Sequence, residues 1–184
     1  NVADGMSKGI QFLFKKNNIL HLKGYGIIAG NNNVEVEDPD GNKKSYSAKN
    51  IIIAAGARSK ELPNLKQDGK KIIGYREAMT LDRQPATMVV VGSGAIGSEF
   101  ANFYQSIGTS VTLVEFLPRI VPNEDEEVSK QLERSFKKMK MKIMTDSSVE
   151  SVDTSKEKCM VTIKTPKGSE IVETDIVFSA VGIV

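Results

Sequence analysis

A glycine-rich stretch in the middle of this 184-residue chain constrains the fold more than any other feature. Residues 87–91 are β-branched or apolar, and they lead directly into Gly-Ser-Gly-Ala-Ile-Gly at residues 92–97. Phe100, Phe103 and Ile107 then follow at the i, i+3, i+7 spacing of one helix face. The stretch therefore predicts a buried strand, a tight glycine turn and a helix, which is the first half of a βαβ unit.

Each glycine of this turn has a physical role. Gly92 lets the chain turn sharply out of the strand, Gly94 leaves room for a pyrophosphate beside the backbone, and Gly97 lets the helix pack close to the sheet. The start of the helix directs unpaired N–H groups and its positive dipole end at the same pyrophosphate. We therefore expect the turn to cradle the pyrophosphate of a dinucleotide at Gly92, Gly94 and Gly97.

An acid at the end of the next strand indicates which dinucleotide binds. Residues 111–114 read as a strand, and Glu115 follows, 18 residues after Gly97. A carboxylate there accepts hydrogen bonds from ribose hydroxyls and repels the 2′-phosphate of NADP. The pattern predicts NAD(H) as the ligand. The alternative is an ordinary glycine-rich turn that binds nothing, with Glu115 as a solvated strand end.

The rest of residues 85–184 predicts a layered α/β domain. A helix capped by Asn123, with acids at 124–127 in its first turn, is followed by a strand at 141–144. Three alternating segments, 149–152, 159–164 and 170–173, predict an antiparallel meander, and 175–180 returns to a buried-strand pattern. We expect a Rossmann-like fold with meander, parallel-sheet and helix layers.

Residues 1–84 predict a different and incomplete domain. The expected elements are a helix at 2–16 with Met6, Ile10, Leu13 and Phe14 on one face, strands at 19–23, 34–37 and 44–48, a buried parallel strand at 51–57 and a short helix at 75–81. The segment 38–42, Asp-Pro-Asp-Gly-Asn, predicts a turn. Pro85 marks the expected boundary, so we divide the chain into domains 1–84 and 85–184.

Composition excludes several functions. The net charge is only +2 and no apolar run has the length of a bilayer, so we expect neither a nucleic-acid nor a membrane partner. The single cysteine, Cys159, fits a reducing compartment, which favours the cytoplasm. We expect Cys159 and the only histidine, His21, to be structural, and we expect no metal site. The chain begins without Met and ends just after an apolar run, so we interpret it as an excised fragment.

Several motifs together resemble the two-dinucleotide-fold flavoprotein disulfide reductases, and within them the dihydrolipoamide dehydrogenases. The resemblance covers nearly the whole chain, and it is specific in order and spacing. It rests on Gly24-Tyr25-Gly26, residues 51–57, residues 92–99, residues 111–116, Pro122, residues 174–178 and Val181-Gly182. It implies the end of an FAD-binding domain followed by an NAD-binding domain.

The resemblance also implies roles for individual residues. It places Gly92, Ser93, Gly94, Ala95, Ile96 and Gly97 around the NAD pyrophosphate and Glu115 at the adenosine ribose. It also places Glu99 by the nicotinamide, Val149 against the adenine and Gly182 along the NAD, with hydride transfer near Ile96. On the flavin side it implies FAD contacts at Gly26, Ala55, Gly56 and Ala57. Ala55 stands where the family usually has Thr, and this departure removes a hydroxyl from that contact.

What the chain lacks limits the function that the resemblance implies. The family's C-x₄-C redox pair is not in this sequence, and disulfide exchange needs two sulfurs. The implied activity of the parent is electron transfer from dihydrolipoyl thiols through FAD to NAD, in a homodimer that serves the lipoyl-bearing protein of a 2-oxoacid dehydrogenase complex. We expect the fragment itself to be inactive and to contain no catalytic residue. Alternatives are a peroxide- or mercuric-type flavoprotein reductase, or a non-catalytic nucleotide-sensing module.

Overall fold

The protein is described by a computed structural model that covers residues 1–184. The chain divides into two compact units, Asn1–Ala55 and Gly56–Val184. This division differs from the boundary expected at Pro85, because β4 (Ile72–Ile73) pairs with β11 (Ile176–Ser179) in the sheet of the second unit. The assignment of residues 1–84 and 85–184 to two cofactor domains stays a prediction.

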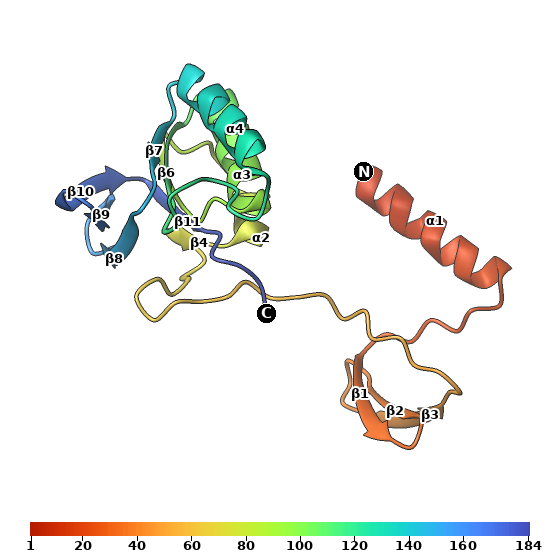
Figure 1. Ribbon diagram of the computed structural model, residues 1–184. Helices are drawn as coiled ribbons and strands as arrows, with labels where there is room; N and C mark the ends of the chain where they lie inside the picture. Colours follow the sequence, from red (N-terminus) through yellow and green to blue (C-terminus); the bar gives the residue numbers. More distant parts are fainter. The chain divides into compact units, whose positions relative to one another are not determined.

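The second unit is built on a five-stranded sheet in the order β4-β11-β5-β6-β7. Its remaining strands are β5 (Thr87–Val91), β6 (Ser110–Val114) and β7 (Lys142–Met144), and all neighbouring strands run parallel. Helices α2 (Tyr75–Ala78), α3 (Ala95–Ser106) and α4 (Glu126–Lys138) lie on one face of this sheet (Figure 1).

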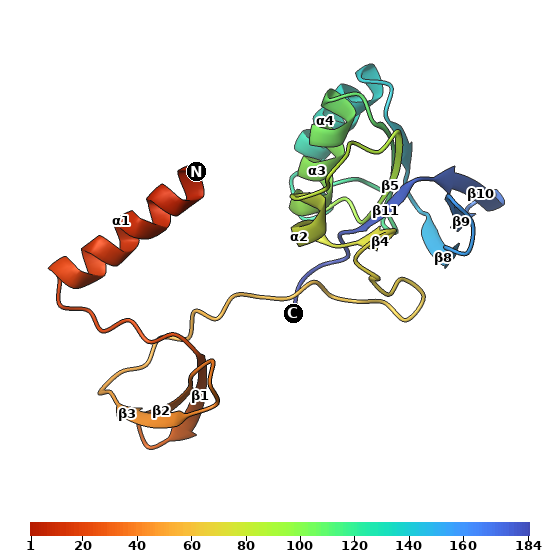
Figure 2. The same ribbon diagram turned by 180° about the vertical axis from the view of Figure 1, so that it is seen from behind.

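An antiparallel meander lies on the other face, as the view from behind also shows (Figure 2). It consists of β8 (Ser148–Asp153), β9 (Cys159–Thr165) and β10 (Gly168–Thr174), in the order β10-β9-β8. The predicted α/β class, its three layers and its element order are therefore confirmed.

The alternation of side chains along β5 explains why the sheet needs both covering layers. Met88 and Val90 belong to a buried cluster that includes residues of α3 and α4, while Val89 and Val91 belong to a second cluster that includes β8 and β9. All four side chains are at most 7% exposed. A run that is apolar on both faces is typical of a central parallel strand.

Two details of this unit differ from expectation. Asn123 is not the cap of α4, because it lies inside a turn in which the Glu124 N–H donates to the Val121 carbonyl at 2.9 Å. The cap is Asp125, whose carboxylate accepts the N–H of Glu127 at 2.8 Å. The strand β4 was not predicted, since two residues are too few to show a periodic pattern. None of the helices has the length and apolar character needed to cross a membrane.

The first unit contains a helix and a small antiparallel sheet. Helix α1 spans Val2–Lys16 and is capped by Asn1, and the sheet joins β1 (Tyr25–Gly30), β2 (Asn33–Glu37) and β3 (Lys43–Ser47) in that order. The predicted helix, the turn at 38–42 and the strands on either side of it are confirmed. The predicted apolar face of α1 has no buried residue.

Two of the strands predicted in residues 1–84 do not form. Residues 19–23 are irregular, and the first strand begins after Gly24, whose φ of +151° brings the position of a Cβ within 2.1 Å of the Glu37 carbonyl oxygen. Residues 51–57 are also irregular, with Ile52 90% and Ile53 73% exposed. A strand requires a neighbour for its backbone groups, and no segment of the chain pairs with residues 51–57.

Candidate functional site

The glycine turn between β5 and α3 is fixed by close backbone contacts. Gly92 has a φ of +94°, and a Cβ there would lie 2.5 Å from the Ala180 carbonyl oxygen. A Cβ on Gly97 would lie 1.9 Å from the Gly92 carbonyl oxygen. Gly94 differs, because a Cβ there would meet nothing within 4 Å. Two glycines therefore permit the packing of the turn, and the third leaves an open face beside the backbone.

A cavity of about 480 Å³ lies at this turn. The last residues of β5 and β6, Val91 and Val114, line it, so it lies at the carboxyl ends of the central parallel strands, where ligands bind in folds of this class. Six of the ten predicted NAD residues line it, namely Gly92, Ser93, Gly94, Glu115, Val149 and Gly182. The remaining lining residues are Leu62, Leu65, Val91, Val114, Phe116, Leu117, Ser147, Ser148, Ala180 and Val181.

Glu115 is a buried carboxylate at this cavity, and it is 7% exposed. Its Oε2 accepts the backbone N–H of Ser93 at 2.8 Å and the hydroxyl of Ser93 at 2.7 Å. Its Oε1 accepts the backbone N–H of Leu117 at 2.9 Å. The carboxylate therefore links the glycine turn to the end of β6, so the alternative of a solvated strand end is wrong.

The other walls of the cavity are mostly apolar. Leu65 is 1% exposed, whereas Phe116 is 75% exposed. Asn64 donates its side-chain amide to the Val149 carbonyl at 2.6 Å, which holds the leucine segment against β8. A single buried acid among apolar walls can orient a ligand that combines hydroxyls with a flat ring.

Sequence reasoning missed this leucine wall. Leu62 and Leu65 stand in a polar stretch without helical or strand periodicity, so no local signal marks them. The sequence does offer a signal for Phe116, because this residue directly follows the predicted acid Glu115.

Four predicted NAD residues lie outside the cavity lining. Ala95, Ile96 and Gly97 form the first turn of α3, where Ile96 is 38% exposed and Gly97 is buried. Glu99 is exposed and lines a separate groove with Ala78, Met79, Phe100 and Phe103. The expected nicotinamide contact of Glu99 stays a prediction.

The predicted FAD residues are divided between the two units. Gly26 lies in β1 and Ala55 ends the first unit, whereas Gly56 and Ala57 begin the second. Gly26, Ala55 and Gly56 are exposed, Ala57 is half-buried, and none of the four lines the cavity at the glycine turn. Their contact with a flavin stays a prediction.

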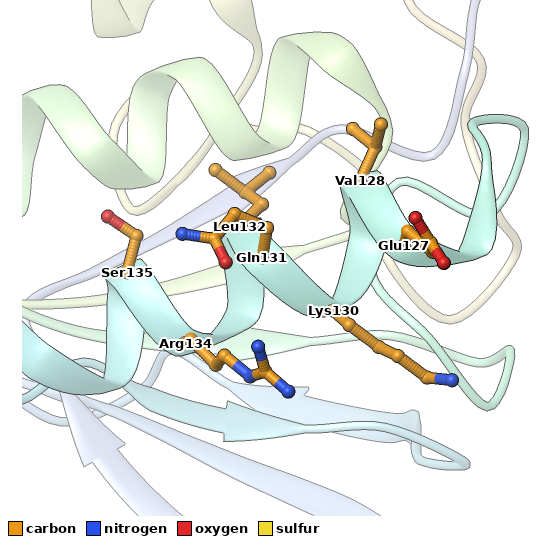
Figure 3. Close-up of a pocket in the computed structure, with 7 residues that line it drawn as sticks. All are labelled: Glu127, Val128, Lys130, Gln131, Leu132, Arg134 and Ser135. Atoms are coloured by element: carbon orange, nitrogen blue, oxygen red, sulfur yellow. The ribbon is translucent and has the colours of Figure 1, made fainter.

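A larger concavity of about 810 Å³ runs along α4 (Figure 3). Its seven lining residues all belong to this one helix, and the close-up shows Lys130 and Arg134 extending away from Val128 and Leu132. A surface formed by one helix, with no second wall, encloses no ligand. We therefore place the candidate site at the glycine turn.

Cys159 and His21 both lie outside the candidate site. The thiol of Cys159 is buried, its Sγ lies 3.9 Å from the Asp175 carbonyl oxygen, and burial raises its pKa. The ring of His21 packs on Phe14 with a centroid distance of 5.4 Å. No group of three or more His, Cys, Asp or Glu residues is placed to hold a metal ion.

The parallel sheet with helices on one face, a meander on the other and a glycine turn at the end of its central strand defines a Rossmann-like α/β protein. The family model for pyridine nucleotide-disulphide oxidoreductases matches residues 1–184. The chain belongs to this family.

Individual relatives agree with this assignment. The chain is 39% identical over 184 residues to dihydrolipoyl dehydrogenase 1, mitochondrial, of Arabidopsis thaliana, an alignment that covers 99% of this chain and 36% of that protein. It is 44% identical over 152 residues to dihydrolipoyl dehydrogenase of Chlorobaculum tepidum, covering 83% of this chain and 32% of the relative. The crystal structure of LpdA from Mycobacterium tuberculosis superposes with a TM-score of 0.88 at 26% identity, covering 100% of this chain and 40% of the other. The chain thus spans only about a third of the length of these curated relatives.

Proposed function

We propose that the cavity at the glycine turn binds NAD(H), and that the chain is the NAD-binding part of a flavoprotein disulfide oxidoreductase. The observation that carries this proposal is the pairing of an open backbone face at Gly94 with the buried carboxylate of Glu115 in one cavity. A pyrophosphate fits the first feature and a ribose hydroxyl fits the second.

The residues present fit the proposed ligand. The backbone at Gly94 and the start of α3 would hold the pyrophosphate, since α3 has no side-chain cap and no acidic residue in its first turn. Glu115 would accept from the adenosine ribose, and the apolar side chain of Val149 would contact the adenine. NAD supplies hydride acceptance when bound, and the residues of this cavity serve to bind and orient it.

For the whole protein we propose dihydrolipoyl dehydrogenase activity, with electrons passing from dihydrolipoyl thiols through a protein disulfide and FAD to NAD. The names of the relatives support this proposal. It includes FAD as second cofactor, a homodimer, a lipoyl-bearing protein of a 2-oxoacid dehydrogenase complex as partner, and a cytoplasmic location. The 184 residues contain a single cysteine, so they do not hold the redox pair, and we expect no lipoamide turnover from this chain by itself.

A nucleotide titration tests the binding site. The chain has no Trp, so the fluorescence of added NADH reports binding without interference. We expect saturable NADH binding and weaker NADPH binding. Gly94→Ala should weaken NADH binding about tenfold or more, because the added methyl group would occupy space that the pyrophosphate needs beside the backbone. A loss of 1.4 kcal/mol of binding free energy raises Kd tenfold.

The matched control is Gly9→Ala in helix α1, where a Cβ likewise meets nothing within 4 Å. It should leave the NADH affinity unchanged. A chain that melts cooperatively and binds no NADH would contradict the proposal. Equal NADH affinity in wild type and Gly94→Ala would show that the turn is not the pyrophosphate site.

A further inference from the structure

Ser93 stands between the first two glycines of the turn, yet it is 0% exposed. All of its polar groups are already engaged. Its N–H and its hydroxyl both donate to Glu115 Oε2, and its carbonyl accepts from the Ser98 hydroxyl and from the Val121 N–H, each at 2.9 Å. A ligand in the cavity therefore has no access to the hydroxyl of Ser93, which can act only through Glu115.

The hydrogen bonds to Glu115 leave it little freedom. A carboxylate has about four acceptor positions, two on each oxygen. Ser93 takes both positions on Oε2, and the N–H of Leu117 takes one on Oε1. One position on Oε1 is therefore left for an outside donor.

The negative charge of Glu115 is also not neutralised by a basic side chain. Glu115 takes part in none of the ion pairs of the chain. Three hydrogen-bond donors stabilise the buried charge in place of a cation. The charge is thus held in one position beside the cavity, at 7% exposure.

We propose that Ser93 is a positioning residue that sets the preference for NADH over NADPH by fixing the carboxylate of Glu115. This inference rests on the proposed NAD(H) function of the cavity. The fixed carboxylate offers its one free acceptor position to a ribose hydroxyl. A 2′-phosphate meets the same charge, which cannot turn away because both positions on Oε2 are bonded to Ser93.

Ser93→Ala removes one of the two donors to Oε2 and adds no atom to the cavity. The acceptor position that it vacates lies beside a side chain that is 0% exposed, so a ligand hydroxyl does not replace the serine. We expect NADH to bind about tenfold more weakly, because the ribose hydroxyl then meets a carboxylate that is less firmly held. This factor corresponds to the lower end of what a hydrogen bond to a charged group contributes. NADPH affinity should stay constant or rise, because the carboxylate, held by two backbone N–H groups instead of three donors, is fixed less firmly against the phosphate.

The matched control is Ser98→Ala. Ser98 is also buried, at 5% exposure, and its hydroxyl donates to the Ser93 carbonyl without touching Glu115. It should leave the ratio of NADH to NADPH affinity unchanged. Both affinities are measured by nucleotide fluorescence on the full chain, with thermal melting to check folding; Ser93→Cys, which keeps only a weak donor, serves if the alanine variant does not fold.

A double-mutant cycle with Glu115→Gln tests the route of the effect. In the Glu115→Gln background, Ser93→Ala should change the NADH to NADPH ratio no further. An equal change in both backgrounds would overturn the inference, as would a parallel fall of both affinities in Ser93→Ala and Ser98→Ala, tighter NADH binding, or no change. Absence of NADH binding by the wild type would instead overturn the proposed function, and this inference with it.

Discussion

Of two apolar runs of similar composition in this molecule, one forms a buried strand and the other stays exposed and unpaired. Residues 51–55, Ile-Ile-Ile-Ala-Ala, and residues 87–91, Thr-Met-Val-Val-Val, both read as buried parallel strands. The second is β5, paired with β11 and β6, and its Val90 is 0% exposed. The first pairs with nothing, and its Ile53 is 73% exposed.

The two runs differ in whether other segments pair with them and cover them, not in their intrinsic β-strand propensity. A parallel strand needs at least one hydrogen-bonding neighbour, and its sheet is normally covered by other layers on both faces. The chain supplies all of these for β5, but none for residues 51–55. An apolar run therefore favours burial, but the segment is buried only where other parts of the chain pair with it and cover it.

The largest expected effect comes from placing a charge in each run. Val90→Asp puts an unpaired carboxylate among Leu113, Phe178 and the other residues of the buried cluster that includes residues of α3 and α4. An uncompensated buried charge costs about 3–5 kcal/mol, a large part of the stability of a domain. We expect the second unit to lose its cooperative fold, measured by hydrogen–deuterium exchange of peptides from residues 87–114.

Ile53→Asp is the matched substitution in the other run. Its side chain is already in water, so exchange and melting of the second unit should not change. Unfolding caused by Ile53→Asp would show that residues 51–55 are packed in solution, and the contrast between the two runs would then fail.

The same reasoning explains how much of the fold could be predicted. The βαβ unit and the meander were predictable because each lies close in sequence to its partners and shows periods of 3.6 or 2 along the chain. The strands at 19–23 and 51–57 were predicted from the pattern of each short segment by itself, without a partner strand. The cap of α4 was displaced from Asn123 to Asp125 because backbone turns precede the helix, and residue type alone does not reveal them.

The candidate site was predictable only where local geometry defines it. The glycine turn and Glu115 belong to one short βαβ motif, so their spacing predicted that they would meet. Leu62 and Leu65 come to the cavity from a separate irregular segment, held there by Asn64. The bonds between Ser93 and Glu115 were not foreseen, since neither residue type requires them.

An intermediate effect is expected from truncating one leucine in each unit. Leu113 in β6 is 0% exposed, and Leu13 in α1 is 52% exposed. Leu113→Ala should cost about 2–5 kcal/mol, from lost transfer free energy and the cavity left behind. Leu13→Ala should cost close to nothing, because Ala favours a helix at least as well as Leu.

Chemical denaturation monitored by circular dichroism measures both variants. The midpoint should fall for Leu113→Ala at an unchanged slope, which indicates a change of stability alone. A comparable loss in Leu13→Ala would mean that the apolar face of α1 is buried in solution.

The smallest expected effect concerns a turn that both units build in the same way. Asp38 Oδ1 accepts the N–H groups of Asp40 and Asn42 at 3.0 and 2.8 Å. Asp68 Oδ1 accepts those of Lys70, Lys71 and Ile72 at 2.8, 2.8 and 2.9 Å. Each aspartate thus closes a turn before a strand, β3 in the first unit and β4 in the second.

Both carboxyls have a pKa below the ordinary value of 3.8. At Asp38 the side-chain amide of Asn42 is the largest cause of the lowered pKa. At Asp68 the largest single cause is partial burial, which acts to raise the pKa. The hydrogen bonds from backbone N–H groups together outweigh it, so the pKa is lowered. Because the folded-state pKa is lowered, the stabilisation is present above pH 3.8 and is lost as the pH falls through the lowered pKa.

Asp68→Asn should therefore lower the melting temperature of the second unit by only a few degrees at neutral pH. A change of 1 kcal/mol moves the midpoint by about 4–8 °C for a domain of 60–100 residues and by about 2–4 °C for one of 150–250 residues, and the second unit, Gly56–Val184, lies between these sizes. The gap between wild type and variant should narrow as the pH falls below 3.8, where the wild type loses the same charge. Asp38→Asn should leave this melting temperature unchanged and instead speed amide exchange at Asn42, which loses its charged acceptor. A gap that stays constant down to the acid transition would show that the charge of Asp68 contributes nothing, and that turn geometry alone holds β4 at the edge of the sheet.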